Sequence, residues 1–289
     1  MSNGTQELPA EAPDTLLPLN DRSAARLWKA LRDLEALIPS DPAFERFIAD
    51  QRPAVLLVTP LVSLGGRQTE FVKAARTLGV PSALLVFSWD NLSNKGVIHT
   101  IPDRVFVWNE VQREEATKLH RVPAAAVVAT GAPRFDLFFR MAPSLDRAAF
   151  CETAGLDPAR PLVVYLASSP AADAVVGLNT SAEIEAGILG KPVYTIRAPD
   201  VAPGQTGSTH FQYLLESQGG FVHDAATLEQ HVEQLGEGLA GRFSAERLQT
   251  FVHGFVRPRG LEVPASRVLA EEIVAFVAHA RQGSRLRRV

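Results

Sequence analysis

Three residues capable of chemistry, Trp89, Asp90 and Asn91, follow a run of apolar residues in the stretch LLVFSWDNLSN. In open α/β sheets, ligands bind beyond the carboxyl ends of the strands. A carboxylate there can take the proton of a substrate hydroxyl, with an indole ring as an amphipathic wall. The alternative is that Asp90 or Asn91 caps the turn that follows. Asp90 is therefore a candidate general base, and its two neighbours are candidate acceptor-side residues.

A second candidate site lies in VVGLNTSAEIEAGILGKPVYTI. The free amides at the start of a predicted helix, Ala182–Leu189, together with hydroxyl groups, form a site for phosphate. Glu183 and Glu185 lie in the first turn, where a carboxylate is favoured and can accept hydrogen bonds from ribose hydroxyls. The alternative is an ordinary capped helix without a ligand. The residues that can cap this helix follow a predicted strand, Ala174–Gly177, and are Asn179, Thr180 and Ser181.

A third cluster, VVATGAPRFDLF, places Arg134 and Asp136 after the predicted strand Val127–Thr130. The forked donors of arginine pair well with phosphate oxygens, so Arg134 is a candidate for binding a diphosphate. The alternative is a structural pair between Arg134 and Asp136 at a helix cap.

A fourth loop, APDVAPGQTGSTHFQYL, follows the predicted strand Val193–Ile196. A protonated His210 would neutralise a leaving diphosphate. The alternative is that His210 caps a helix over 211–217. The polar residues of this loop that are candidates for contacting a donor are Gln205, Thr206, Ser208, Thr209 and His210.

The sequence offers little for a metal or a dinucleotide. The stretch TPLVSLGGRQTEF contains Gly65, Gly66 and Arg67, but it has neither the Walker pattern nor a full G-x-G-x-x-G. The seven histidines are scattered, no Asp-x-Asp occurs, and Cys151 is the one cysteine. We therefore predict no metal site and no cofactor.

Predicted strands alternate with predicted helices along most of the chain, which indicates parallel sheets with right-handed crossovers. The 289 residues suffice for two domains. We predict an α/β fold of two Rossmann-like domains that face a cleft. The predicted parts are a disordered leader over 1–20, an acceptor-side domain over 21–142, a linker over 143–160, and a donor-nucleotide domain with a C-terminal helix over 161–289.

One connection is too short for this scheme. Only SSPAA separates the predicted strand that ends at Ala167 from the one that begins near Asp173. A parallel crossover ordinarily needs about 12 residues or more. Either the two strands are not ordinary sheet neighbours joined by a crossover, or the second domain lacks a helix–strand–helix insertion and is shortened.

The stretch TSAEIEAGILGKPVYTI resembles the donor-nucleotide loop of GT-B glycosyltransferases, UDP-N-acetylglucosamine 2-epimerases and CDP-glycerol glycerophosphotransferases. The shared pattern is a Ser/Thr-rich turn, then Glu-Ala, then Gly-x-Pro-Val. The resemblance implies that Thr180 and Ser181 meet the diphosphate and that Glu185 meets the ribose.

Three other stretches are similar to parts of the same enzymes. GAPRFD is similar to their G-x-P-R-x-D at the domain junction, which implies that Arg134 binds the donor. SWDNLSNKG resembles the position of a strand-end Trp-His-Gly, with Asp90 in place of the histidine, a departure from the pattern of the CDP-glycerol transferases. The loop of Arg67 corresponds to one that approaches ligands from the first domain, which makes Arg67 an acceptor-side candidate.

The resemblance implies a metal-independent transferase that moves a glycosyl or glycerophosphoryl group from a nucleotide-sugar or CDP-glycerol donor to a glycan or lipid-linked acceptor in cell-surface polysaccharide biosynthesis. The alternatives are a truncated, non-catalytic nucleotide-binding relative and a UDP-sugar epimerase or hydrolase. The net charge of −3 argues against nucleic acid, and no segment reaches the roughly 20 apolar residues of a membrane span. We expect a cytoplasmic protein, either free or peripheral at the inner membrane face.

Overall fold

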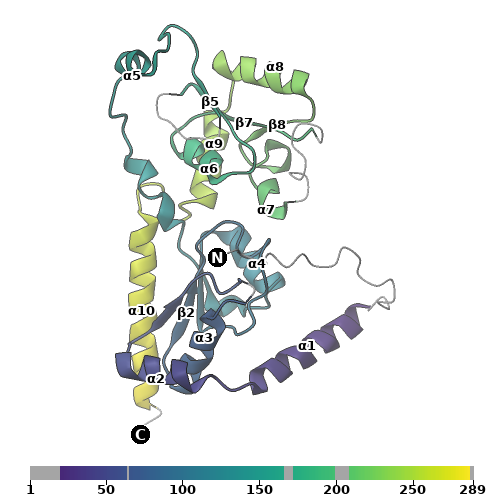
Figure 1. Ribbon diagram of the computed structural model, residues 1–289, viewed down its shortest axis with the longest axis vertical. Helices are drawn as coiled ribbons and strands as arrows, with labels where there is room; N and C mark the ends of the chain where they lie inside the picture. Colours follow the sequence, from purple (N-terminus) through teal and green to yellow (C-terminus); the bar gives the residue numbers. More distant parts are fainter. Residues whose placement is uncertain (1–19, 64, 166–171, 199–207, 287–289) are drawn as a thin grey trace, which may run out of the picture. The chain divides into compact units, whose positions relative to one another are not determined.

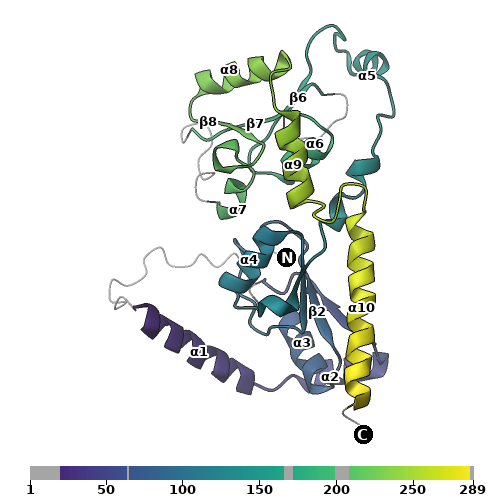
Figure 2. The same ribbon diagram turned by 180° about the vertical axis from the view of Figure 1, so that it is seen from behind.

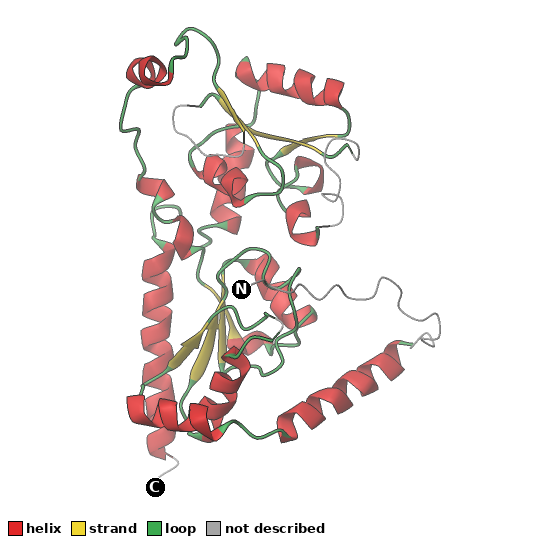
Figure 3. Cartoon of the chain, in the orientation of Figure 1, coloured by secondary structure: helices red, strands yellow, loops and turns green. Residues whose placement is uncertain are grey.

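A computed structural model describes residues 20–63, 65–165, 172–198 and 208–286. By internal contacts the chain separates into two units, one up to Pro39 and one from Ser40 onward. Figure 1 shows their elements coloured along the chain, and Figure 3 separates helices from strands. The predicted leader over 1–20 lies almost entirely outside the described residues. The predicted boundaries at 142 and 160 stay a prediction.

The unit up to Pro39 contains one described helix, α1 (Asp21–Leu37). Its N-cap is Asn20, whose side chain accepts a hydrogen bond from the Ser23 amide at 2.9 Å. The leucines at helical spacing in SAARLWKALRDLEALI predict this helix from the sequence, with the serine as its cap. Asparagine caps at least as well because its side-chain oxygen reaches the same free amides.

The second unit contains two four-stranded parallel sheets, as the sequence predicts. Each strand pairs with the next one along the chain, in the orders β1-β2-β3-β4 and β5-β6-β7-β8. The strands are short and rich in valine and leucine, as expected of strands covered on both faces. They are β1 (Leu56–Val58), β2 (Ser82–Leu85), β3 (Arg104–Val107), β4 (Val127–Ala129), β5 (Val163–Tyr165), β6 (Ala174–Val176), β7 (Val193–Ile196) and β8 (His223–Ala225).

Helices lie between most consecutive strands, whereas the connection from β2 to β3 contains turns and no helix. The C-terminal helix α10 contacts the short helix η2 (Pro133–Phe135), and Figures 1 and 2 both show α10 running along the first sheet. The α-helices of this unit are α2 (Pro42–Gln51), α3 (Gln68–Thr77), α4 (Glu110–Lys118), α5 (Arg147–Ala154), α6 (Ser181–Ile188), α7 (Thr209–Gln212), α8 (Leu228–Leu239), α9 (Ala245–Phe255) and α10 (Ala265–Leu286).

The short connection between β5 and β6 joins hydrogen-bonded parallel neighbours, with Val164 opposite Val175. The two strands are therefore sheet neighbours, although their connection is shorter than an ordinary crossover. Residues 166–171 lie outside the described part.

A buried apolar cluster extends from the second sheet to the first. Trp89, Trp108, Ala132 and Phe135 come from segments that follow strands of the first sheet. They belong to the same cluster as residues of the second sheet and its helices, among them Val175, Ile184, Val193, Phe211, Leu214 and Phe255. This shared core joins the two sheet-bearing parts.

Candidate functional site

The turn after β2 is held by Asn91. Its side-chain oxygen accepts hydrogen bonds from the backbone amides of Phe87 and Ser88 at 3.2 and 3.1 Å, and the residue is buried. These amides precede Asn91 in the chain, whereas the turn-capping alternative has the side chain cap the turn that follows it. Asn91 therefore stabilises the turn that leads into it. Its predicted acceptor-side role stays a prediction, with the side-chain oxygen already engaged.

Asp90 lies in this turn, with 19% of its side chain exposed and its Oδ2 3.2 Å from Nζ of Lys95. Burial alone would raise the pKa of Asp90, but a hydrogen bond from Ser88 and the nearby Lys95 ammonium hold it below its ordinary value. Asp90 is thus a carboxylate at neutral pH, the protonation state that a general base requires.

Trp89 packs against His210 of α7. The two rings meet edge to face, with centroids 4.7 Å apart and planes at 88°, and both residues are 6% exposed. Trp89 is therefore a buried contact between segments that follow β2 and β7, whereas the sequence predicts a wall of an open cleft. A shared core explains the difference, because the indole is covered from both sides.

His210 does not fit its predicted cationic role. Burial lowers its pKa, although the Asp90 carboxylate acts in the opposite direction, so the imidazole is neutral at neutral pH. Among the described residues, its Nδ1 atom has no hydrogen-bond partner. His210 lies within α7, which ends at Gln212, and the predicted helix over 211–217 is wrong.

The start of α6 forms a capping box. The Thr180 hydroxyl accepts from the Ala182 amide at 3.4 Å, and Oε2 of Glu183 accepts from the Thr180 amide at 2.9 Å. Some amide donors of the predicted phosphate site, those of Thr180 and Ala182, therefore already donate to side chains. Among the described residues the Ser181 amide has no partner, and the Ser181 hydroxyl is half-buried beside it.

Glu183 is fully buried. Burial raises its pKa to about 8, although hydrogen bonds from the Thr180 and Asn179 amides act against the shift. Its carboxyl group packs so closely under Gly177 that a Cβ atom at Gly177 would lie 2.4 Å from Cγ of Glu183. Glu183 is hence a neutral structural residue below about pH 8, whereas Glu185, two residues further on, is half-buried.

The turn before α6 meets the end of the fourth loop. Asn179 adopts a left-handed conformation with φ of 57°, and its Nδ2 donates to the Ser208 hydroxyl at 3.1 Å. The structure thus brings Ser208 to the α6 turn, as expected of a common site. Gln205 and Thr206 lie outside the described residues, and Thr209 is an exposed residue at the start of α7.

The predicted pair of Arg134 with Asp136 is wrong. Asp136 pairs instead with Arg257, 2.6 Å away, and also accepts from the amides of Ala265 and Ser266 at the start of α10. These bonds hold the pKa of Asp136 below its ordinary value in spite of burial. A partner 121 residues away in sequence explains why no local pattern predicts it.

Arg134 is exposed and lies over the rings of Phe87 and Phe135, at 5.2 and 5.3 Å from their centroids. Among the described residues, no hydrogen bond or ion pair links Arg134 to Thr180 or Ser181. Its predicted donor-binding role therefore stays a prediction. Arg67 lies just before α3, with its guanidinium 5.0 Å from the ring centroid of Phe44 in α2.

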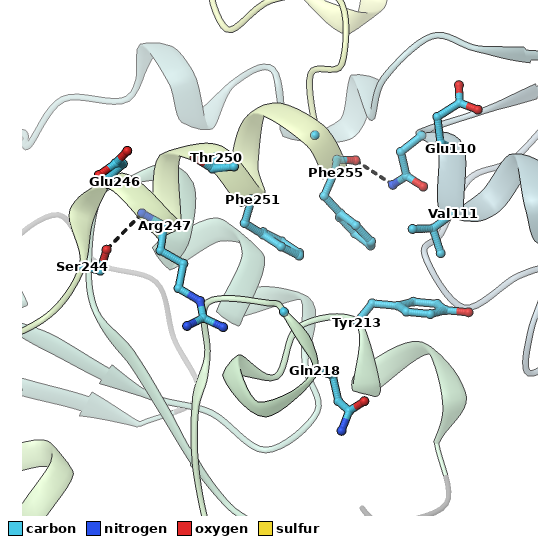
Figure 4. A pocket seen from close by; sticks show the side chains of 13 residues that line it. Glu110, Val111, Tyr213, Gln218, Ser244, Glu246, Arg247, Thr250, Phe251 and Phe255 are labelled. Atoms are coloured by element: carbon cyan, nitrogen blue, oxygen red, sulfur yellow. Dashed lines mark hydrogen bonds between the residues drawn. The ribbon is translucent and has the colours of Figure 1, made fainter.

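Two polar contacts that the sequence does not predict join the two sheet-bearing parts. Nδ2 of Asn109 donates to the Phe255 carbonyl at 2.8 Å, and the Tyr213 hydroxyl donates to Glu115 at 2.9 Å. Burial raises the pKa of Glu115 to about 7. These contacts border a cavity of about 620 Å³, into which Tyr213 and Phe251 point (Figure 4).

Within the described ranges, no group of three or more His, Cys, Asp or Glu residues could hold a metal ion. The described helices include none that is long and apolar enough to cross a membrane. The expectation of a metal-independent reaction stays a prediction.

No protein-family model matches the sequence, and no curated protein matches it. The fold is similar to that of the UDP-GlcNAc 2-epimerase from Methanocaldococcus jannaschii, with a TM-score of 0.50 at 11% identity over 85% of this chain and 82% of the epimerase. Two structures of the wall teichoic acid polymerase TagF give TM-scores of 0.41 and 0.39, at 12% and 11% identity, over 61% and 67% of this chain and 58% and 61% of theirs. The likeness to the epimerase, at this low identity, establishes the fold alone: the chain has the GT-B architecture that its sequence predicts.

Proposed function

We propose that the protein is a GT-B-type transferase that moves a glycosyl or glycerophosphoryl group from a nucleotide-activated donor to an acceptor hydroxyl of a surface polysaccharide. The observation that carries the proposal is that the Asp90 carboxylate, 19% exposed, adjoins Trp89 in the chain, and that Trp89 packs against His210. The carboxylate follows a strand of the first sheet, and the imidazole follows a strand of the second. Ligands of open parallel sheets bind at such strand ends.

The donor occupies the start of α6 in this proposal. The Ser181 amide and the hydroxyls of Thr180 and Ser181 bind the diphosphate, helped by the helix dipole. Glu185 accepts hydrogen bonds from the ribose. Glu183, neutral at pH 7 because its pKa is about 8, adds no negative charge next to the phosphates.

Asp90 accepts the proton of the acceptor hydroxyl. The acceptor oxygen then forms a bond to the transferred carbon or phosphorus, and the bond from that atom to the nucleotide phosphate oxygen breaks. The departing nucleotide takes the negative charge, which the Ser181 amide stabilises. His210 acts as a neutral group that shapes the position of Trp89.

A panel of nucleoside diphosphate sugars and CDP-glycerol, assayed by thermal shift, tests the donor. One donor is expected to raise Tm by several degrees, because a ligand that binds the native state stabilises it. Asp90→Asn is then expected to retain that shift and to lower transfer by roughly 100-fold or more. The matched control is Asp157→Asn, which changes an exposed aspartate elsewhere.

The same panel separates the competing functions. A donor that binds wild-type protein but is never transferred favours a non-catalytic nucleotide-binding relative. The indole of Trp89 is buried against His210 and is not exposed to a ligand, which supports that second candidate. If the protein converts a UDP-sugar to its epimer in the absence of an acceptor, its function is epimerisation and not transfer.

Peripheral attachment to the inner membrane face is part of the proposal. Helix α1, described by itself, exposes Leu27, Leu31 and Leu34 at 48%, 51% and 61%, spaced so that they form one stripe. Basic residues on the opposite face suit an interfacial helix. We expect the wild type to co-sediment with anionic vesicles and the Leu31→Glu variant to stay in the supernatant. Wild-type protein that stays in the supernatant would contradict membrane attachment. The basic residues are Arg22, Arg26 and Lys29.

A further inference from the structure

An apolar cavity of about 380 Å³ lies at the carboxyl edge of the first sheet, beside the turn that carries Asp90. Residues at the ends of all four strands of this sheet line it, and Leu269 of α10 forms a further wall. The volume is within the usual range for small-molecule sites. The apolar lining includes Leu85, Val86, Phe87, Phe106, Trp108 and Leu269.

A single charge borders this apolar space. Arg134 is the one charged residue among the described residues that line the cavity. Its guanidinium lies over the Phe87 and Phe135 rings, and it makes no ion pair or hydrogen bond with any described residue. An exposed arginine positioned by two rings has its forked donors available to an anion.

The cavity depends on how closely α10 approaches the sheet. Gly131 has φ of 92°, and a Cβ atom there would lie 2.7 Å from Cβ of Ala265 at the start of α10. Asp136 fixes the same end of α10 by accepting from the Ala265 and Ser266 amides. These contacts place Leu269, one turn along α10, over the strand ends.

We propose that this cavity binds an anionic amphiphile: its apolar chain enters between the strand ends and α10, and its phosphate or carboxylate pairs with Arg134. The apolar lining selects the chain, and the unpartnered guanidinium selects the sign of the head group. Because the cavity adjoins the Asp90 turn, the bound amphiphile is the membrane-derived end of the acceptor. Only that last assignment rests on the proposed transferase function.

Isothermal titration with short, non-micellar probes tests the site without any nucleotide. The probes are octyl phosphate, octanol, inorganic phosphate and octyltrimethylammonium. Octyl phosphate is expected to bind at least about tenfold more tightly than any of the others, because it combines apolar burial with a charge-assisted hydrogen bond. An octanoate titration distinguishes a carboxylate head from a phosphate.

Variants locate the binding. Arg134→Gln is expected to weaken octyl phosphate by about tenfold and to leave octanol unchanged. The matched control Arg140→Gln, a second exposed arginine in the neighbouring short helix η3 (Phe138–Arg140), is expected to change neither. Leu269→Trp adds volume to existing space and is expected to weaken both octyl probes.

Equal affinity for octyl phosphate and octanol overturns the inference, as does an Arg134→Gln protein that binds octyl phosphate like the wild type. An octyl phosphate affinity that Leu269→Trp leaves unchanged places the chain elsewhere and overturns it too. Binding of octyl phosphate by a protein that binds no nucleotide keeps the cavity assignment and removes only the proposed transferase function.

Discussion

Replacing Glu183 by glutamine should change how the stability of the protein depends on pH. The carboxyl group is fully buried, and burial raises its pKa from 4.5 to about 8 in the native protein. An unfolded chain releases this proton near pH 4.5, whereas the native chain holds it to about pH 8. Because the native state binds more protons in this window, the free energy of unfolding falls as pH rises through it.

The size of the effect follows from those two pKa values. Between about pH 5.5 and about pH 8.5, this one group lowers the free energy of unfolding by roughly 3 kcal/mol. Glutamine still offers an oxygen to the Thr180 amide but does not titrate. The stability of Glu183→Gln should therefore decline less than that of the wild type over the same interval, by that amount.

Urea denaturation followed by far-ultraviolet circular dichroism at both pH values measures the difference. Glu185→Gln is the matched control, because Glu185 occupies the same helix but is only half-buried. The titration of Glu115 contributes equally to both proteins and cancels. If Glu183→Gln and the wild type lose stability in parallel, Glu183 is ionised in the native state and this explanation of the capping box is wrong.

Two further predictions concern packing. Asp136→Ala should lower the free energy of unfolding by roughly 3–5 kcal/mol in urea, since it leaves the buried guanidinium of Arg257 without its counter-ion; a loss below about 1 kcal/mol would mean that the pair is solvated. Gly177→Ala should cost about 1–3 kcal/mol because the new methyl group overlaps Glu183. Gly236→Ala, where a Cβ would meet nothing within 4 Å, is the control and should be neutral or stabilising; equal losses for the two glycines would rule out the overlap.

Strands with continuous apolar runs could be predicted from the sequence, as could the helices with clear caps. The strand β8 could not, because two of its three residues are His223 and Asp224, and only pairing with β7 makes it a strand. The missed helix α2 does carry a signal, since Asp41 caps it and Pro42 occupies its first position.

The sequence predicts which segments form the candidate site, but it does not predict which side chains in these segments pair with one another. The sequence places Trp89 and His210 in loops at strand ends, and the structure brings these loops together. The pairing of Asp136 with Arg257 depends on a contact between distant segments, which local patterns do not contain. Thr180 and Glu183 do show the capping-box spacing, which predicts that part of the phosphate site is already satisfied.

The proposed transfer requires that the backbone amide of Ser181 bind the diphosphate of a nucleotide donor. Proline is tolerated at the first position of a helix, and Thr180 before it is extended with φ of −129° and ψ of 153°, so Ser181→Pro removes this amide without breaking α6. Isothermal titration with UDP, CDP, GDP and TDP should find one nucleotide that binds the wild type and also binds Ser181→Ala, which keeps the amide. The same nucleotide should bind Ser181→Pro at least about tenfold more weakly than it binds the wild type. Equal binding to all three proteins, or no binding of any of these nucleotides to the wild type, would contradict the claim.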